Sequence, residues 1–144
     1  MQTLDALSQS ADIKQLLQSI TSIAIVGLSP KKDRPSNMVA RYLLEAGYTI
    51  YPVNPGQTEI LGQTCYPDLA SVPHDIEIVD IFRKSEDILP VVEKALELKP
   101  LPTAIWMQQG IVNDVAAVLA RDKGLSVIMD RCIKVDHYNI VAGK

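Results

Sequence analysis

The sequence predicts an α/β fold in which helices cover both faces of a mainly parallel five-stranded sheet. Five short runs rich in β-branched and apolar residues recur about 25 residues apart. Segments with apolar residues at helical spacing lie between these runs, as in consecutive β-α-β units. A chain of 144 residues with 47% hydrophobic residues is long enough for one buried core, so we expect a single domain over residues 1–144.

The first half of the chain supplies two helices and two strands. Residues 9–19 carry one apolar stripe at helical spacing, and residues 36–46 repeat this pattern before Gly47, a typical helix end. The run 22–27, SIAIVG, predicts a strand that is covered on both faces. Residues 48–53, YTIYPV, predict the second strand, because a turn cluster, Asn-Pro-Gly, follows directly.

The middle of the chain is less regular before the pattern resumes. We expect a small β element at residues 59–62 and a short helix at 68–72. Residues 76–82, IEIVDIF, predict the third strand, in which Asp80 interrupts the apolar run and is expected to be paired internally. Residues 85–98 predict the next helix, since the proline in this segment falls in the first turn.

The last two strands complete the sheet. They are predicted at residues 103–108, TAIWMQ, and 125–130, LSVIMD. Between them, Asn113 is a good N-cap for a helix that ends at Lys123, and the tail from Arg131 is expected to be partly helical or irregular. Three apolar residues of this helix are expected to face inward: Val115, Val118 and Leu119.

This order of elements predicts a Rossmann-like three-layer sandwich. Parallel strands joined by right-handed crossovers place all their carboxyl ends at one edge of the sheet. Ligands bind beyond that edge, at the point where the strand order reverses. The segments in which to look for a site are therefore residues 27–37, 54–56, 82–84, 108–110 and 130–132.

Composition excludes several classes of partner. The formal net charge of −3 argues against a broad nucleic-acid-binding face, and no apolar run approaches the roughly 20 residues of a membrane span. The polar N-terminus lacks the pattern of a signal peptide, so we expect a cytoplasmic protein. Cys65 and Cys132 are far apart and form no C-x-x-C pair, which indicates neither a zinc site nor a disulfide framework.

The loop at residues 27–37, GLSPKKDRPSN, has the position of a phosphate-binding turn but lacks the pattern G-x-G-x-x-G. The following helix starts near Ser36, and its unpaired N–H groups carry the positive end of the helix dipole. Beside them are three cations against one anion: Lys31, Lys32 and Arg34 against Asp33. We predict that the loop holds several phosphate charges. The alternative is a solvated loop, in which Ser36 and Asn37 serve only as helix caps.

The next two strand ends narrow the choice of ligand. A dinucleotide site normally has a carboxylate after the second strand to bind the adenosine ribose. Here Asn54 and Pro55 follow instead, so the sequence disfavours NAD as the ligand and leaves NADP open. Two roles are open for Asn54: it binds a nucleotide, or it only forms an Asn-Pro turn. After the third strand, Phe82 and Arg83 offer a ring and a cation for an adenine face or a phosphate, although Phe82 also fits a core-filling role.

The sequence contains few residue patterns that are typical of catalytic or metal sites. Neither His74 nor His137 belongs to a cluster with metal-ligand spacing, and His74 is expected in an exposed loop. Cys132 at the fifth strand end is either a structural cysteine or a partly activated thiol, and a Cys–His pair with His137 would require spatial contact. No G-x-S-x-G or P-loop pattern occurs. These residues favour binding over chemistry.

Five segments in order resemble the stand-alone CoA-binding proteins, which share the Rossmann-like CoA-binding domain of the succinyl-CoA synthetase α-subunit. The resemblance covers roughly residues 22–137. The segments are IAIVGLSPKKDRPSNMVARYLLEAGY, YPVNPGQTEILGQTCYPDL, VDIFRKSEDI, WMQQGIVND and VIMDRCIKVDH.

The resemblance implies that the phosphates and the ADP portion of CoA lie across the first two strand ends. The implied contacts are backbone and hydroxyl groups of Gly27, Leu28 and Ser29, the phosphate-side residues Lys31, Arg34 and Ser36, the nucleotide-side residues Asn54 and Pro55, and Phe82 and Arg83 beneath them. The phosphohistidine and ligase domains of the synthetases have no counterpart in these 144 residues, which favours a non-catalytic binding or regulatory protein over an enzyme.

We therefore expect a small-molecule ligand, CoA or an acyl-CoA, and neither nucleic acid nor a membrane as partner. A protein partner or a homo-oligomer stays open. The alternative from the enzyme class is an NADP-linked oxidoreductase. A third hypothesis is an interaction module that has lost its ligand and acts through a partner subunit.

Overall fold

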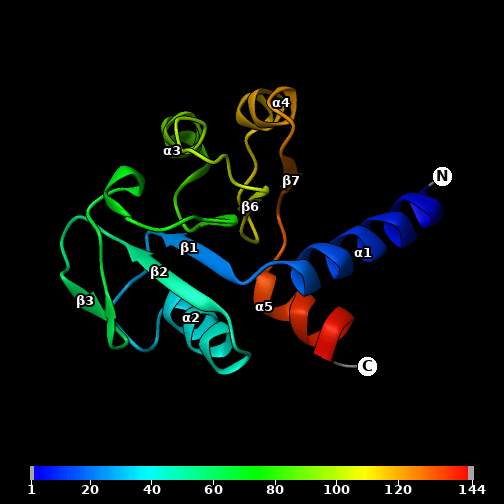
Figure 1. The fold of residues 1–144 in the computed structure, drawn as a ribbon. Coiled ribbons are helices and arrows are strands. Elements are labelled where there is room, and N and C mark those ends of the chain that lie inside the picture. The colour runs from blue at the N-terminus through cyan, green and yellow to red at the C-terminus, as the bar shows by residue number, and fades with distance from the viewer. Residues whose placement is uncertain (1, 143–144) are drawn as a thin grey trace.

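A computed structural model describes residues 2–142 and forms three layers around one sheet (Figure 1). The sheet has five strands, all parallel, in the order β2, β1, β5, β6, β7. In that order the bounds are Thr49–Val53, Ser22–Val26, Ile78–Ile81, Ala104–Met107 and Ser126–Ile128. The predicted α/β, Rossmann-like class is confirmed.

Helices cover the two faces of this sheet. Helices α1, α2 and α5 pack on one face, and α3 and α4 pack side by side on the other (Figure 1). Their bounds are α1 Gln2–Ser19, α2 Pro35–Glu45, α3 Ile88–Ala95, α4 Asp114–Asp122 and α5 Ile133–Asp136. Short elements are the hairpin β3 Glu59–Ile60 and β4 Gln63–Thr64, the 3-10 turns η1 Leu69–Ser71 and η2 Ser85–Asp87, and the π-helical end η3 His137–Ala142.

Strand burial explains the apolar runs in the sequence. Every residue of β1, β5 and β6 is buried, because each of these strands has a neighbour on both sides and a helix layer on both faces. The two layers form separate cores. Ile25 and Trp106 belong to the core under α1, α2 and α5, whereas Val79 and Ile105 belong to the core under α3 and α4.

Several predicted boundaries needed correction. The first helix extends N-terminally to Gln2, and the helix expected at 85–98 is divided into η2 and α3. Helix α2 begins at Pro35 with Arg34 as its N-cap, so Ser36 and Asn37 do not cap it. Both side chains are instead buried and bonded to the preceding loop.

The predicted inward face of α4 is wrong. Val115 and Val118 are 67% and 56% exposed, and Leu119 is half-buried. The residues that pack on the sheet are fully buried alanines: Ala116, Ala117 and Ala120. Small side chains let the helix axis approach the sheet closely, and hydrophobic periodicity does not detect them because the valines dominate the pattern.

The strand order reverses between β1 and β5. The chain leaves β1 for α2 on one face, and it leaves the neighbouring β5 for α3 on the other face. In an open parallel sheet this divergence produces a crevice at the carboxyl edge. The registers align the strand ends, because Val26 pairs with both Val53 and Ile81. The segments that follow β1, β2 and β5 therefore start side by side.

Candidate functional site

Gly27 brings the loops after β1 and β5 into direct contact. Its backbone has φ +87°, a conformation that side chains disfavour, and a Cβ at this position would overlap the carbonyl oxygen of Phe82. The same Cβ would lie 3.2 Å from Cδ of Arg83. Gly27 N also donates to Val53 O at 2.9 Å, which ties the loop to the end of β2. One glycine thus allows three strand ends to meet, without the G-x-G-x-x-G pattern.

The rest of the loop is held by its own hydrogen bonds. Ser29 N donates to Ser36 Oγ at 3.0 Å, and Asn37 Nδ2 donates to Ser29 O at 2.8 Å. Arg41 secures the outer part, since its Nη2 donates to Lys32 O at 2.8 Å. Ser36 N, at the first turn of α2, has no hydrogen-bond acceptor within residues 2–142. The loop is therefore shaped in advance and presents a free N–H at a helix N-terminus, which favours an anion.

Leu28 and Asn54 serve the structure of this edge. The Leu28 side chain is fully buried, so only its backbone faces the loop. Asn54 Nδ2 donates to Leu28 O at 2.9 Å, and Asn54 Oδ1 accepts from Gly56 N at 2.9 Å. The Asn-Pro turn alternative is thus present, and Asn54 also joins the ends of β1 and β2. Its amide groups are used internally, and its surface lines a hollow with Pro55.

A hollow of about 530 Å³ lies beyond the ends of β1 and β2, on the α3 side of the sheet. Its floor is Val26, Gly27 and Val53, and its walls come from η1 and α3 with the side chains of Leu69 and Val91. Charged side chains stand at its rim: Arg83, Lys94, Asp68 and Glu97. A mostly apolar cleft with a few charges at the mouth is the usual form of a small-molecule site.

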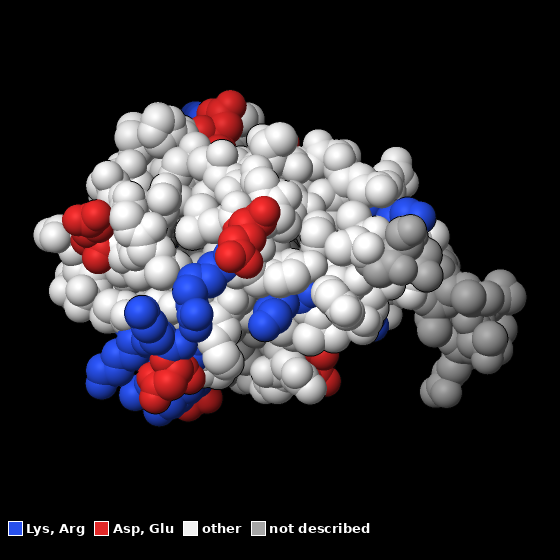
Figure 2. Space-filling view, turned by 90° about the horizontal axis from the view of Figure 1, so that it is seen from below, with Lys and Arg blue, Asp and Glu red and all other residues white. Residues whose placement is uncertain are grey.

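Cations gather at the same end of the molecule. Lys31, Lys32 and Arg34 are exposed on the loop after β1, and Arg83 and Lys84 are exposed on the loop after β5. Figure 2 shows a cluster of Lys and Arg side chains at the lower left, the side on which β1 ends in Figure 1, and further ones scattered elsewhere on this face. Acidic residues are interspersed; one of them, Asp87, lies 3.8 Å from Arg83 Nη2.

A second hollow of about 550 Å³ lies on the opposite, α2 side of the strand ends. Arg83 lines both hollows, so the contact between the loops after β1 and β5 forms a ridge between them. The half-buried Phe82 packs on the core, which confirms its predicted core-filling role, and it also lines the second hollow. The half-buried thiol of Cys132 lines it as well, together with Gln108.

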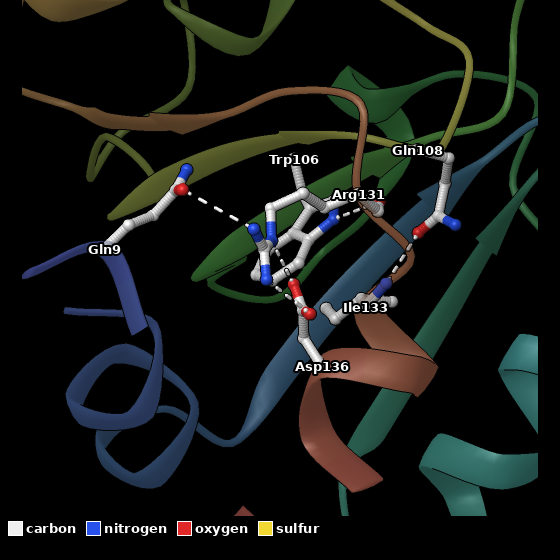
Figure 3. Close-up of polar contacts among 6 residues, drawn as sticks. All are labelled: Gln9, Trp106, Gln108, Arg131, Ile133 and Asp136. Atoms are coloured by element: carbon white, nitrogen blue, oxygen red, sulfur yellow. Dashed lines mark hydrogen bonds and ion pairs between the residues drawn. The ribbon is translucent and has the colours of Figure 1, made fainter. Parts of the chain in front are cut away.

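Arg131 fixes the segment that carries Cys132 (Figure 3). Its guanidinium forms a two-pronged ion pair with the buried Asp136, with N–O distances of 2.7 and 2.8 Å. Its carbonyl accepts from Trp106 Nε1 at 2.8 Å, and its Nη1 reaches Gln9 Oε1 at 3.4 Å. These contacts anchor the start of α5 to β6 and α1. Sequence reasoning missed them, because no local pattern links residues this far apart.

Asp80 is a fully buried carboxyl whose partner is Gln108. One terminal amide atom of Gln108 lies 2.8 Å from Asp80 Oδ1 and 3.3 Å from Ile133 N. If this atom is the amide oxygen of Gln108, it accepts hydrogen bonds from Ile133 N–H and from a protonated Asp80. If it were the amide nitrogen, Ile133 N–H would face another donor. Burial raises the pKa of Asp80 well above its ordinary value, which favours the protonated form. The predicted internal pairing of Asp80 is confirmed.

Both histidines contact aromatic side chains. His137 Nδ1 lies 2.8 Å from the Tyr42 hydroxyl, and the ring packs edge-on against Tyr42 and Tyr48. Burial lowers the pKa of His137, and within residues 2–142 no hydrogen bond joins it to Cys132. His74 is exposed in a loop, as predicted, and stacks on Tyr51.

Comparison with known protein families identifies the family to which this sheet and its carboxyl edge belong. A family model described as a CoA binding domain matches residues 21–138, which includes every strand and loop described above. The chain belongs to the CoA-binding domain family. Its five-stranded parallel sheet and the crevice beyond the strand ends are thus the framework of a CoA-binding domain, as the sequence resemblance implied.

Two of the similar proteins match this chain over nearly their whole length. The chain is 45% identical over 127 residues to the uncharacterized protein YneT of Bacillus subtilis, covering 88% of this chain and 93% of that one. A solved structure of a hypothetical protein from Pyrococcus horikoshii has a TM-score of 0.87 at 39% identity, with 92% of both chains covered. The chain thus aligns with nearly the whole length of both proteins.

Larger relatives contain the domain as one part. The chain is 31% identical over 72 residues to the ADP-forming acetate–CoA ligase I of Archaeoglobus fulgidus. That match covers 50% of this chain but only 10% of the ligase. The CoA-binding domain is thus homologous to a small portion of a much longer enzyme. Among the described residues, no helix is long and apolar enough to cross a membrane.

We expect the substitution Gly27→Ala to destabilise the protein more than Gly124→Ala. Both glycines have positive φ, at +87° and +91°, so alanine adds about 1–2 kcal/mol of backbone strain at either position. Only at Gly27 would the methyl group also collide with the carbonyl of Phe82, whereas Gly124 has open space. Urea denaturation of both variants measures the difference. Equal losses of stability would contradict the close approach of the two loops.

We expect the stability of the Asp80→Asn variant relative to wild type to increase with pH. A carboxyl whose pKa is raised in the folded state contributes stability below its unfolded pKa of about 3.9, and this contribution is lost as pH rises through the folded pKa. Asparagine matches the shape of the neutral acid and donates to Gln108 at every pH. Denaturation at several pH values between about 4.5 and 8 tests this; a difference that does not change with pH would contradict a protonated Asp80.

Proposed function

We propose that the protein binds coenzyme A or an acyl-CoA through its phosphates and ADP portion, in a binding or regulatory role. The observation that carries the proposal is the ridge at Gly27: it joins a basic loop and a helix N-terminus to a nucleotide-sized hollow at the switch point. Membership of the CoA-binding domain family supports the same ligand.

The charges of the ligand fit the charges of this edge. CoA carries a pyrophosphate and a 3′-phosphate, about four negative charges, which favour several cations together with a free helix N–H. The exposed cations Lys31, Arg34 and Arg83 and the N–H of Ser36 supply these groups. The absent side chain at Gly27 gives the ligand close access to the backbone, and the Ser29 hydroxyl would donate to a phosphate. The adenosine would occupy the hollow beside Asn54 and Pro55.

The second hollow fits the other end of the ligand. A molecule that places its nucleotide on the α3 side and its phosphates on the ridge can extend its arm over Arg83 to the α2 side. Phe82 and Val39 provide apolar surface there, and Cys132 and Gln108 provide polar groups. The bound arm would be half-enclosed, which fits a protein that holds CoA or presents it to a partner.

Calorimetric titration with CoA, dephospho-CoA, NADPH and ATP tests the proposal. We expect saturable binding of CoA, weaker binding of dephospho-CoA, which lacks the 3′-phosphate, and no saturable binding of NADPH. Saturable binding of NADPH without any response to CoA would overturn the proposal in favour of a redox cofactor. Native mass spectrometry of the purified protein adds an independent readout, because retained CoA would appear as a mass increment.

We expect Arg34→Ala to weaken CoA binding by about 5- to 100-fold, the range for loss of one charge-assisted hydrogen bond. The matched control is Lys99→Ala, which removes an exposed cation just before β6, at the opposite edge of the sheet. Circular dichroism confirms that both variants are folded. Unchanged affinity for the Arg34 variant would assign this residue to a solvated loop.

A further inference from the structure

Helix α4 buries small side chains and exposes larger apolar ones. Its buried face consists of the alanines Ala116, Ala117 and Ala120, all with 0% exposure. Its outer face carries Val115 and Val118 at 67% and 56% exposure, and Val112, just before the helix, is 42% exposed. Valine has a lower helix propensity than alanine and gains nothing from facing water. This arrangement leaves an apolar strip of three valines on the solvent-exposed face of α4.

Charged residues flank these valines in a self-complementary arrangement. Asp114 and Arg121 are seven residues apart, two turns or about 10.5 Å along the helix, so they lie on the same side of the apolar strip. Neither forms an ion pair within residues 2–142. One helix thus presents a negative group at its start and a positive group at its end, with valines between them.

We propose that α4 is the contact surface between two copies of this chain, paired antiparallel about a twofold axis. A twofold axis near residues 117 and 118 places Asp114 of one copy opposite Arg121 of the other, and the reverse, which forms two ion pairs. Val118 of each copy then lies at the centre of the contact, with Val115 beside it. Asp122, one residue beyond Arg121, lies at the level of Asn113 of the second copy, next to the ion pair between Arg121 and Asp114.

The position of α4 permits this contact. α4 packs against α3 and β7 on its inner sides and lies at the outer edge of its layer (Figure 1). Two helices of nine residues make a small contact, below the roughly 1,200 Å² of a stable standard interface. We therefore expect a weak dimer in rapid exchange. The contact uses none of the residues proposed to bind CoA, so it does not depend on that proposal.

Sedimentation velocity of the full chain from about 10 µM to about 1 mM tests the proposal. The wild-type sedimentation coefficient should rise with concentration toward that of a dimer. Val118→Lys should weaken dimerisation at least about tenfold. Val135→Lys is the matched control, because Val135 is a 48% exposed valine on α5, and it should dimerise like wild type. Circular dichroism checks the fold of each variant.

A charge-exchange pair tests the antiparallel arrangement. Arg121→Asp alone should weaken the dimer, because Asp114 of the second copy would then face another aspartate. Adding Asp114→Arg should restore the association, since both ion pairs are rebuilt with reversed polarity. The proposal would be overturned by a wild-type protein that stays monomeric at every concentration, by a Val118→Lys variant that dimerises like wild type, or by a double variant no stronger than the single one.

Discussion

The contact between Gly27 and the carbonyl of Phe82 is the constraint on which the site depends. β1 and β5 are neighbours whose following chains diverge to opposite faces, and the absent side chain at Gly27 lets their loops touch before they separate. The touching loops form the ridge that brings Arg83 beside the basic loop and divides the two hollows. A side chain at Gly27 would force the loops apart and merge or distort both hollows.

Internal polar contacts preserve this edge around the ridge. Ser36 and Asn37 hold the basic loop, Asn54 joins it to the end of β2, and the Asp80–Gln108 pair supports the start of α5. Most of these groups are buried, where a hydrogen bond left unmade is costly, so each pair strongly favours one arrangement. The edge is therefore shaped before any ligand arrives, which reduces the ordering that binding requires.

The elements of the fold were predictable where hydrophobicity alone decides them. β1, β5 and β6 are buried on both faces, so their apolar runs located them to within two residues at each end. The inner face of α4 was not predictable, because alanines leave no hydrophobic signal beside Val115 and Val118. At the site, Gly27 and the cations could be found from their position after a strand. The hydrogen bond from Asn54 to Leu28 could not, since it joins two separate loops. The bond between Ser29 and Ser36 could not either, since it depends on how the loop folds back onto the start of α2.

An NMR titration of the ¹⁵N-labelled protein with CoA tests the central claim most directly, because each loop has its own backbone amide signals. If the ridge organises one continuous ligand site, the amide signals of residues 27–37, 54–56 and 82–84 shift together and saturate at the same CoA concentration. Shifts confined to the opposite edge of the sheet, around Thr21, Glu77 and Thr103 at another hollow, would contradict the account.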